Sequence, residues 1–309
     1  MPSPLEISLS PLPPKPVAPG AKVAWIGLGA MGIPMVTRLF AAGYSIVAYN
    51  RTQHDSFASL PFPMLPTPAE VIRNVDLVIL MLRDGQATQN VLEGKEGILN
   101  SLAPGQIVIN MSTIAPDEAK EEARRVMERH AFYFDIPVSG SVVPATRGEL
   151  LLLAGGDEGL RGIIETPLSI LGKSLHWFGP AGSGMAAKLA VNLLLAAHME
   201  SLAETLQAGS HLGLDKRALA AAILDSPLGT PFSRIKFRNL LEKDYTMAFS
   251  ASLMKKDLDL LEKSLGSSSS DHPSLSVLRA LYQKILDRGQ GERDLSIVAE
   301  ALTQDQEII

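Results

Sequence analysis

The sequence contains no cysteine, which excludes disulfide bonds and catalysis by a thiol. This composition suits a reducing compartment, so we expect a cytoplasmic location. The six histidines show no ligand spacing on a shared helix face and no grouping with carboxylates. We therefore expect no metal site.

The sequence also lacks a long apolar run and a large excess of one charge. Its most apolar later stretch, residues 185–198, is short and is interrupted by Lys188 and Asn192, so it suits a buried helix better than a membrane span. The net charge is −5 and no basic stripe is present, which argues against binding of nucleic acid. We expect neither a membrane nor a nucleic acid as a partner.

What is present is enough apolar sequence for two ordinary domains, because 46% of the 309 residues are hydrophobic. Residues 1–20 contain seven prolines and lack the basic start and apolar core of a secretory signal. We expect this segment to form an extended arm or a flexible tail outside the catalytic fold.

Residues 23–52 have the pattern of a dinucleotide-binding unit. An apolar strand, 23–26, runs into a glycine-rich turn, and a helical pattern then leads to a second strand, Ser45–Tyr49. In such a GxGxxG turn, the first glycine permits a tight turn, the second lets a pyrophosphate approach, and the third lets the helix pack closely. The expected cofactor-binding residues of the turn are Gly27, Leu28, Gly29, Ala30, Met31 and Gly32.

The residues after the second strand favour NADP over NAD. A chain that binds NAD usually has an acidic residue there for the ribose hydroxyls, but this chain has Asn50, Arg51 and Thr52. No carboxylate would repel a 2′-phosphate, and the guanidinium of Arg51 could bind one. The alternative is that Arg51 is an ordinary surface arginine and that NAD is used.

Alternating strand and helix patterns continue to about residue 178. This alternation predicts a doubly wound parallel sheet, an α/β Rossmann domain over 21–182. From 183 onward the period is helical only, which predicts an all-α domain over 183–309, beginning with a long helix at 185–212. The other expected strands are 76–81, 106–110, 132–135, 149–154 and 174–178, with a loop at 137–148. The other expected helices are 53–60, 85–92, 116–129, 159–172, 215–224, 230–241, 251–265, 274–287 and 294–302.

Lys188 and Asn192 are candidates for the chemistry, since they are spaced i, i+4 and share one face of an otherwise apolar helix. Burying them is costly unless they face a polar cleft, where a lysine can exchange a proton with a substrate oxygen. The alternative is a lysine whose ammonium group reaches the surface.

Two further segments are less specific when taken alone. Ser139, Gly140 and Ser141 follow an expected strand end, and a turn of this kind can bind a carboxylate, although a plain loop is the simpler interpretation. The pair Lys256-Asp257 is most simply a solvated helix face.

The motifs GLGAMGIPM, NRT, MSTIAP, PVSGS with PATRGEL, GSGMAAKLAVN and KKDL follow one another in order. In this combination the chain resembles the β-hydroxyacid dehydrogenase family over about residues 22–302. The resemblance implies a Rossmann domain followed by a helical domain like that of 6-phosphogluconate dehydrogenase. It also implies hydride transfer between a nicotinamide and the carbonyl or alcohol carbon of a small carboxylate substrate.

The same resemblance implies residue roles. Lys188 would be the general acid/base, Asn192 would hold the substrate, and Ser139, Gly140 and Ser141 would bind its carboxylate. Cofactor contacts beyond the glycine turn and residues 50–52 would come from Leu82, Arg83, Thr113 and Lys256. A homo-oligomer, a dimer or tetramer, is the family-level expectation.

Two departures from the common family pattern narrow the prediction. Ser141 stands where many members have a second glycine, which looks more like the glyoxylate/succinic semialdehyde reductase branch, and Arg83 replaces a common proline and could add to 2′-phosphate binding. Imine reductases of this broad family generally lack the lysine, which argues against an imine substrate.

The leading prediction is therefore an NADP-dependent reductase of small aldehyde acids. The alternatives are an NAD-dependent 3-hydroxyisobutyrate-type dehydrogenase, a tartronate semialdehyde reductase, and a non-catalytic dinucleotide-binding sensor or scaffold.

Overall fold

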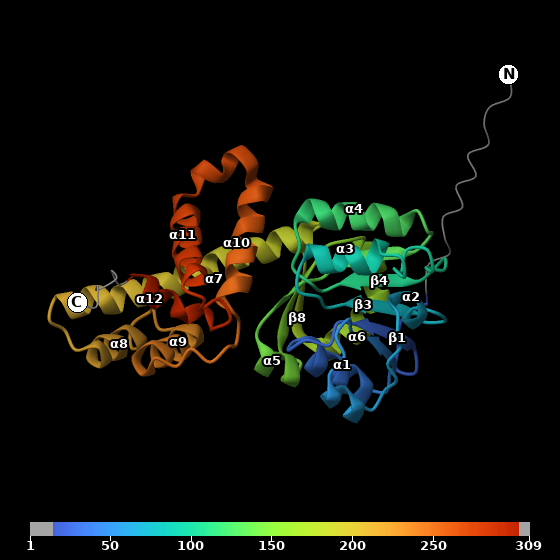
Figure 1. Cartoon of the computed structure of the whole chain (residues 1–309), viewed down its shortest axis with the longest axis horizontal. Helices are drawn as coiled ribbons and strands as arrows, with labels where there is room; N and C mark the ends of the chain where they lie inside the picture. Colours follow the sequence, from blue (N-terminus) through green and yellow to red (C-terminus); the bar gives the residue numbers. More distant parts are fainter. Residues whose placement is uncertain (1–14, 303–309) are drawn as a thin grey trace, which may run out of the picture. The chain divides into compact units, whose positions relative to one another are not determined.

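A five-stranded parallel sheet lies at the centre of the first half of the chain in the computed structural model. Its strand order is β2-β1-β3-β4-β5, so the order reverses at β1, which the glycine-rich turn follows. Figure 1 labels β1, β3 and β4 of this sheet. The strands are β1 (Lys22–Ile26), β2 (Ser45–Tyr49), β3 (Leu77–Leu80), β4 (Ile107–Asn110) and β5 (Phe132–Asp135). In open sheets of this kind, ligands bind outside the carboxyl ends of the strands near the reversal.

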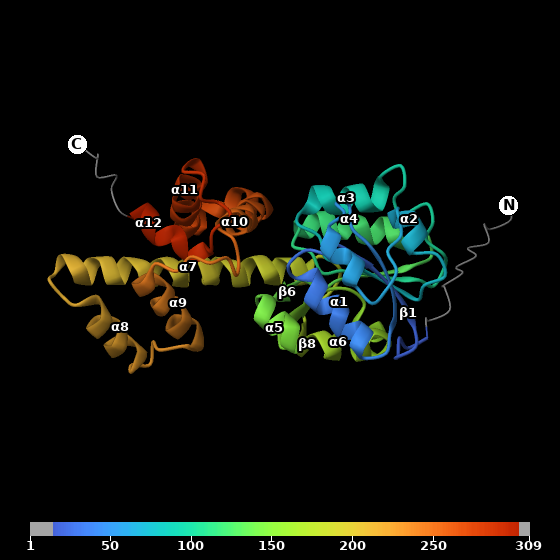
Figure 2. The ribbon, with the colours of Figure 1, turned by 60° about the horizontal axis from the view of Figure 1, so that its bottom comes forward.

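Helices cover both faces of this sheet because both faces are apolar. In β1, Val23 and Trp25 belong to one core, whereas Ala24 and Ile26 belong to another. The first core is closed by α1 (Gly32–Ala41) and α6 (Arg161–Leu171), and the second by α2 (Pro68–Val71), α3 (Gly85–Glu93) and α4 (Pro116–Met127). The predicted Rossmann fold class is confirmed, with α3 and α4 on the opposite side from α1 and α6 (Figure 2).

The strands predicted from the sequence are divided between two sheets. Strands β7 (Leu150–Ala154) and β8 (Gly172–Trp177) form a separate sheet with β6 (Val138–Ser139), and β6 runs antiparallel to β7. The predicted loop at 137–148 contains β6 and a short helix, α5 (Val142–Arg147). A two-residue strand and a one-and-a-half-turn helix are too short to give a recognisable period.

The structure describes residues 15–302. Residues 1–14 of the predicted arm lie outside that range, but Val17 is buried against the first core, and its N–H donates to the carbonyl of Ile163 (2.8 Å). At least this end of the proline-rich segment therefore packs on the catalytic fold rather than outside it. Two short 3₁₀ helices, η1 (Asp55–Ser59) and η2 (Glu158–Leu160), complete this half of the chain.

The second half of the described chain is helical and is arranged around α7 (Ser183–His211), with α8 and α9 on one side of it and α10 to α12 on the other (Figure 2). Its core includes Leu189, Met199, Phe237, Met254 and Tyr282. The remaining elements are α8 (Lys216–Leu224), α9 (Pro231–Glu242), α10 (Ala251–Leu265), η3 (Gly266–Asp271), α11 (Pro273–Asp287), η4 (Leu295–Ile297) and α12 (Val298–Leu302). The predicted all-α domain is confirmed, and the 3₁₀ helix η3 connects α10 to α11.

The chain divides into two compact units after Lys188. Helix α7 crosses this division, so its first six residues belong to the first unit and the rest to the second. The boundary predicted from the sequence, after residue 182, falls just before the same helix.

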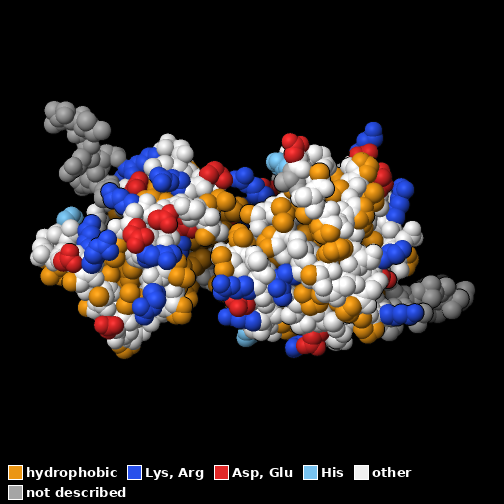
Figure 3. All heavy atoms as spheres, turned by 90° about the horizontal axis from the view of Figure 1, so that it is seen from below, with side chains coloured by type: hydrophobic (Ala, Val, Ile, Leu, Met, Phe, Trp, Pro, Cys, Tyr) orange, Lys and Arg blue, Asp and Glu red, His pale blue; other side chains and the backbone are white. Residues whose placement is uncertain are grey.

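The surface carries mixed charge. On the face shown in Figure 3, Lys and Arg side chains are interspersed with Asp and Glu and form no continuous basic stripe. Over residues 15–302, no helix has both the length and the apolar character needed to cross a membrane.

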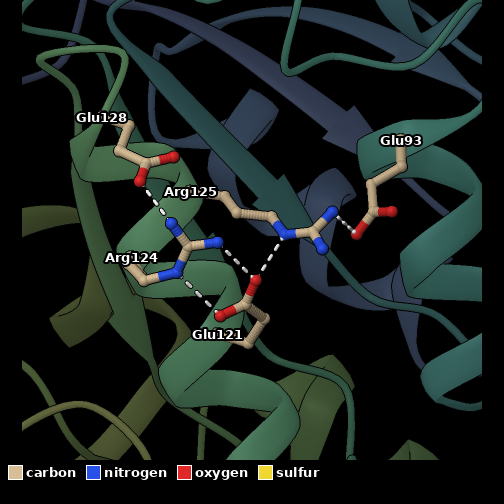
Figure 4. A network of polar contacts seen from close by, with 5 residues as sticks. All are labelled: Glu93, Glu121, Arg124, Arg125 and Glu128. Carbon is tan, nitrogen blue, oxygen red and sulfur yellow. Dashed lines mark hydrogen bonds and ion pairs between the residues drawn. The ribbon is translucent and has the colours of Figure 1, made fainter.

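An exposed network of charged side chains joins α3 to α4 (Figure 4). Glu121 accepts from Arg124 (2.6 Å) and from Arg125 (2.7 Å), Arg124 also pairs with Glu128, and Arg125 also pairs with Glu93. Hydrogen bonds from the two arginines lower the pKa of Glu121 to about 2, and the bond from Arg124 has the largest effect.

Candidate active site

The glycine-rich turn between β1 and α1 has the geometry that a dinucleotide requires. Gly27 has a φ of +108°, and a Cβ at this position would lie 2.2 Å from the carbonyl oxygen of Met81. A Cβ at Gly32 would lie 2.0 Å from the carbonyl oxygen of Gly27. The fold itself therefore requires glycine at both positions, because any side chain would collide with backbone.

Gly29 differs from these two glycines. A Cβ there would meet no atom of the described protein within 4 Å, and its φ does not lie in the left-handed region. Nothing in the described chain itself demands glycine at this position, but a pyrophosphate that approaches the backbone would do so. Helix α1 has no side-chain N-cap and no acidic residue in its first turn, so its N-terminus can take an anion. The turn thus fits a dinucleotide.

Asn50 supports the turn through its side chain. Its Oδ1 accepts from the N–H of Leu28 (2.9 Å), and its Nδ2 donates to the carbonyl of Thr52 (2.6 Å). The neighbouring Arg51 is exposed and has no hydrogen bond or ion pair with another residue of the described chain. Asn50 therefore shapes the turn, and the guanidinium of Arg51 can bind an anion.

Hydrogen bonds join the segments that follow β3 and β4. The N–H of Leu82 donates to Ser112 Oγ (2.9 Å), and the N–H of Ser112 donates to Asn110 Oδ1 (3.0 Å). Leu82 and Arg83 are thereby brought next to the segment that carries Thr113. These three predicted cofactor residues all lie at the carboxyl edge of the sheet.

A buried carboxyl group, Glu122 of α4, completes this support. Its Oε2 accepts from Asn110 Nδ2 (2.8 Å) and from the hydroxyl of Tyr133 (2.7 Å). Burial raises the pKa of Glu122 to about 7, and the two hydrogen bonds oppose that rise. Glu122 was missed by the sequence prediction because its position in α4 resembles that of its exposed acidic neighbours.

The predicted carboxylate-binding residues lie at the rim of the second sheet. Ser139 ends β6, Gly140 has a φ of +138°, and Ser141 precedes α5 as its N-cap residue without a side-chain cap bond. A φ of +138° is one that other residues rarely adopt, so the turn favours glycine here. Neither serine hydroxyl is committed to a hydrogen bond with another described residue.

Lys188 lies in the second turn of α7 and is only 8% exposed. The start of this helix is held by Asp135, whose carboxylate accepts from the N–H groups of Gly182 and Met185 (both 2.8 Å). The burial of Lys188 disagrees with the alternative of a lysine whose ammonium group reaches the surface.

One turn further along α7, Asn192 is 1% exposed and belongs to a buried polar cluster in the second unit. Its Nδ2 donates to Asp257 Oδ2 (2.5 Å), while its Oδ1 is buried without a hydrogen-bond partner among the described residues. Lys256 Nζ lies 2.8 Å from Asp257 Oδ1 as an ion pair that lacks hydrogen-bond geometry. Buried polar atoms are nearly always satisfied, so an unsatisfied amide oxygen indicates a place for a ligand or water.

The simplest sequence interpretation of Lys256-Asp257, a solvated helix face, is wrong. Asp257 is 2% exposed and Lys255 is 8% exposed, and Lys255 pairs with Asp259 (2.6 Å). Asp257 itself was missed as a site residue, because its partner Asn192 is 65 residues away in the sequence.

A hollow of about 470 Å³ lies elsewhere in the first unit, lined by residues that include Pro34, Arg38 and Thr146. It contains none of the predicted site residues, and Arg38 is already bonded to the carbonyls of Ile170 and Thr146. The hollow is therefore a weaker candidate than the glycine turn and Lys188. In the described part of the chain, no three His, Asp or Glu side chains come together as metal ligands would.

Comparisons with known families match both units. A family model described as the NAD binding domain of 6-phosphogluconate dehydrogenase matches residues 22–179. A second model, described as NAD-binding of NADP-dependent 3-hydroxyisobutyrate dehydrogenase, matches residues 182–302. The match therefore extends over nearly the whole described chain.

Individual relatives agree with the family models. The NAD-dependent L-serine dehydrogenase of Pseudomonas aeruginosa is 32% identical over 92% of this chain and 99% of its own length. The chloroplastic glyoxylate/succinic semialdehyde reductase 2 of Arabidopsis thaliana is 30% identical over 91% of this chain and 79% of its own. The human mitochondrial 3-hydroxyisobutyrate dehydrogenase is 31% identical over 94% and 89%, respectively.

A solved structure of 3-hydroxyisobutyrate dehydrogenase from Mycobacterium tuberculosis with L-serine superposes with a TM-score of 0.83 and is 26% identical, covering 92% of this chain and 99% of that one. The sequence motifs, the dinucleotide turn and these matches lead to one conclusion. The chain belongs to the β-hydroxyacid dehydrogenase family and is an NAD(P)-dependent oxidoreductase that acts on CH–OH groups.

Proposed function

We propose that this protein is an NADP-dependent reductase of small aldehyde acids such as glyoxylate and succinic semialdehyde. The observation that carries the proposal is the buried Lys188 with Asn192 one turn further along α7. A buried lysine in a dinucleotide-binding protein is suited to proton transfer, and the chain holds it on a helix rather than on a mobile loop.

The proposed reaction needs a hydride and a proton. NADPH held at the glycine-rich turn would supply the hydride, and Lys188 Nζ would donate a proton to the carbonyl oxygen, so that the aldehyde becomes an alcohol. The buried Oδ1 of Asn192, which has no partner in the described protein, can accept a hydrogen bond from the hydroxyl group of the alcohol product. Asp257 supports this role because its bond to Asn192 Nδ2 fixes which way the amide faces.

The substrate carboxylate would bind at Ser139, Gly140 and Ser141. The two hydroxyls are uncommitted among the described residues, and Gly140 between them has a φ of +138° that favours glycine. Hydroxyl and backbone N–H groups of this kind bind carboxylates well. A serine at position 141 in place of glycine favours the glyoxylate/succinic semialdehyde type.

NADP is preferred in this proposal on account of Arg51. It is exposed and unpaired within the described chain, and residues 50–54 contain no acidic side chain, so a 2′-phosphate could bind it with charge-assisted hydrogen bonds. Lys256 would contact the cofactor or substrate from the helical unit. A cytoplasmic location and a homo-oligomer, a dimer or tetramer, stay predictions.

A steady-state panel tests the proposal. Glyoxylate, succinic semialdehyde and tartronate semialdehyde are offered with NADPH and NADH, and 3-hydroxyisobutyrate, L-serine and 4-hydroxybutyrate with NADP⁺ and NAD⁺. We expect the highest kcat/KM with an aldehyde acid and NADPH. A preference for a hydroxy acid with NAD⁺ would contradict both the substrate and the cofactor assignment.

A second candidate is NAD-dependent oxidation of a hydroxy acid. It is favoured by the 32% identity to an NAD-dependent L-serine dehydrogenase over almost the whole chain. The same panel separates the two candidates. A non-catalytic sensor or scaffold would bind NADPH tightly without turnover of any substrate, and the presence of both Lys188 and Asn192 argues against it.

A further inference from the structure

Asp135 is a fully buried carboxylate at the carboxyl end of β5. Its Oδ1 accepts from the N–H of Gly182 and its Oδ2 from the N–H of Met185, each at 2.8 Å. The two donors are the residues that lead into α7 and form its first turn. Asp135 therefore holds this helix N-terminus with both carboxylate oxygens, in the place where the helix dipole favours a negative charge.

The start of α7 packs closely against β5 and β7. The backbone of Asp135 exchanges hydrogen bonds with Gly155 (3.1 and 2.8 Å), and a Cβ at Gly184 would lie 2.4 Å from the carbonyl oxygens of both Asp135 and Leu153. Helix α7 thus begins in direct contact with β5 and β7, and a glycine at position 184 permits the approach. A displacement of the helix start would break either these contacts or the two carboxylate bonds.

The arrangement differs from the ordinary helix caps in this chain. Asp84 and Asp215 cap α3 and α8 from the position directly before each helix, each accepting one N–H three residues on (2.8 Å). Asp135 acts across 47 and 50 residues of sequence. A local cap stabilises its own helix, whereas Asp135 couples the start of α7 to the central sheet.

Asp135 lies between two parts of the candidate active site. Ser139 follows it by four residues, and Lys188 follows its second bonded residue, Met185, by three, which is a rise of about 4.5 Å along the helix. We propose that Asp135 is a positioning residue whose carboxylate fixes the start of α7 so that Lys188 is held in register with the Ser139–Ser141 segment. This inference rests on the proposed function, in which Lys188 and that segment act on one substrate.

The charge of Asp135 is costly to maintain. Burial raises its pKa to about 6, and the backbone hydrogen bonds from Gly182 and Met185 oppose that rise. An amide in its place would avoid the cost of a buried charge but could accept only one of the two bonds, because its NH₂ group would face a backbone N–H. The need for two acceptors explains why a carboxylate is used.

Two variants of the full-length protein test the role. Asp135→Asn removes one acceptor, and Gly184→Ala leaves the carboxylate in place but forces the helix start away from β5. For each variant we would measure kcat and KM for the preferred aldehyde acid, the Kd of NADPH, and hydrogen exchange of residues 183–190. Asp215→Asn, the same substitution at a local cap of α8, is the matched control.

Both variants should show the same pattern. We expect kcat to fall about tenfold or more, because a misplacement of about 1 Å at a reacting group is sufficient for such a loss. The Kd of NADPH should change by less than about twofold, since the glycine turn is untouched. Exchange at residues 183–190 should accelerate about tenfold or more. Asp215→Asn should leave kcat unchanged.

The outcomes separate this inference from the proposed function. If the wild-type protein reduces no aldehyde acid, the proposed function fails, while unchanged exchange at 183–190 in Asp135→Asn would independently overturn the anchoring role. Wild-type kcat in Asp135→Asn, or a fall in kcat shared equally by Asp215→Asn, would overturn the positioning role. Loss of folded, NADPH-binding protein in both variants would overturn it as well, because Asp135 would then be needed for folding alone.

Discussion

The exposed network on α4 and the buried polar groups of the candidate site use charge in opposite ways. Five side chains make the network of Glu93, Glu121, Arg124, Arg125 and Glu128 (Figure 4), and each remains partly open to water. The buried groups Lys188, Asn192 and Asp257 have almost no access to water.

The groups of the candidate site therefore differ from the network on α4 in their burial. Exposed ion pairs are screened by water and contribute little to stability. A buried polar group is costly unless it is satisfied, so each one in this structure calls for a reason. Four substitutions test this contrast.

Lys188→Ala should lower kcat by at least about 10²-fold, because removal of a general acid typically costs about 10² to 10⁴. The Kd of NADPH, measured by fluorescence titration, should stay close to that of the wild-type protein. The buried Lys255, which pairs with Asp259 on α10, provides a matched control as Lys255→Met. A Lys188→Ala variant that retained more than a few per cent of kcat would remove the proton-transfer role.

Glu122→Gln should make the protein more stable at alkaline pH. The pKa of Glu122 rises from 4.5 to about 7 in the folded chain, so between these values the folded state holds a proton that the unfolded state has lost. This group therefore favours folding most below about pH 4.5, and that benefit is lost as the pH rises through about 7. At pH 8 the charged carboxylate costs about 3 kcal/mol relative to its protonated form.

The amide oxygen of the introduced glutamine can accept the same two hydrogen bonds, so the variant isolates the charge. Urea unfolding followed by circular dichroism should give a higher midpoint for Glu122→Gln than for wild type at pH 8, and a much smaller difference at pH 5. Equal midpoints at pH 8 would show that the buried charge of Glu122 does not destabilise the folded protein.

Arg51→Ala should weaken NADPH binding about tenfold while changing NADH binding by less than about twofold, because only NADPH offers a 2′-phosphate to the guanidinium. Arg51→Lys keeps the charge but loses the bidentate geometry, so its affinity for NADPH should lie between those of the wild-type protein and Arg51→Ala. Isothermal titration calorimetry with NADPH and with NADH measures the Kd of each cofactor. Arg51 is an exception to the contrast between exposed and buried charge, because it is exposed but is expected to bind the cofactor phosphate.

Glu121→Gln should change the protein least. It removes the central acceptor of the exposed network, but water can solvate Arg124 and Arg125 in its place. The urea midpoint should hardly move, and what change there is should shrink in about 1 M salt. A loss of stability as large as the effect at Glu122 would break the distinction between exposed and buried charge.

Local sequence was sufficient to predict most of the fold. The glycine turn and strand β2 could be predicted because their signals lie within about thirty residues, and α10 was predicted with its observed bounds, Ala251–Leu265. The second sheet could not be predicted, since the two residues of β6 carry no period and pair with β7 across an intervening helix.

The sequence predicted the parts of the candidate site that are formed by the backbone of a local motif. It did not predict the parts that are formed by side chains far apart in the sequence. Gly27 and Gly32 are required by close backbone contacts that the motif encodes. Asp257 and Asp135 act on partners 65 and up to 50 residues away. In the sequence Asp135 is an acidic residue at the end of a strand and Asp257 one within a charged helix, and only the structure shows that both are buried.

Helix α7 has a practical consequence for recombining this protein with its relatives. The compact units divide after Lys188, but Asn192 lies one turn beyond that point on the same helix. A chimaera joined at residue 188 would take the lysine that we propose as proton donor from one parent and the asparagine that we propose to hold the substrate from the other. A junction before Ser183 would transfer both residues together, and it would then test whether Asp135 of a foreign Rossmann domain can accept the new helix.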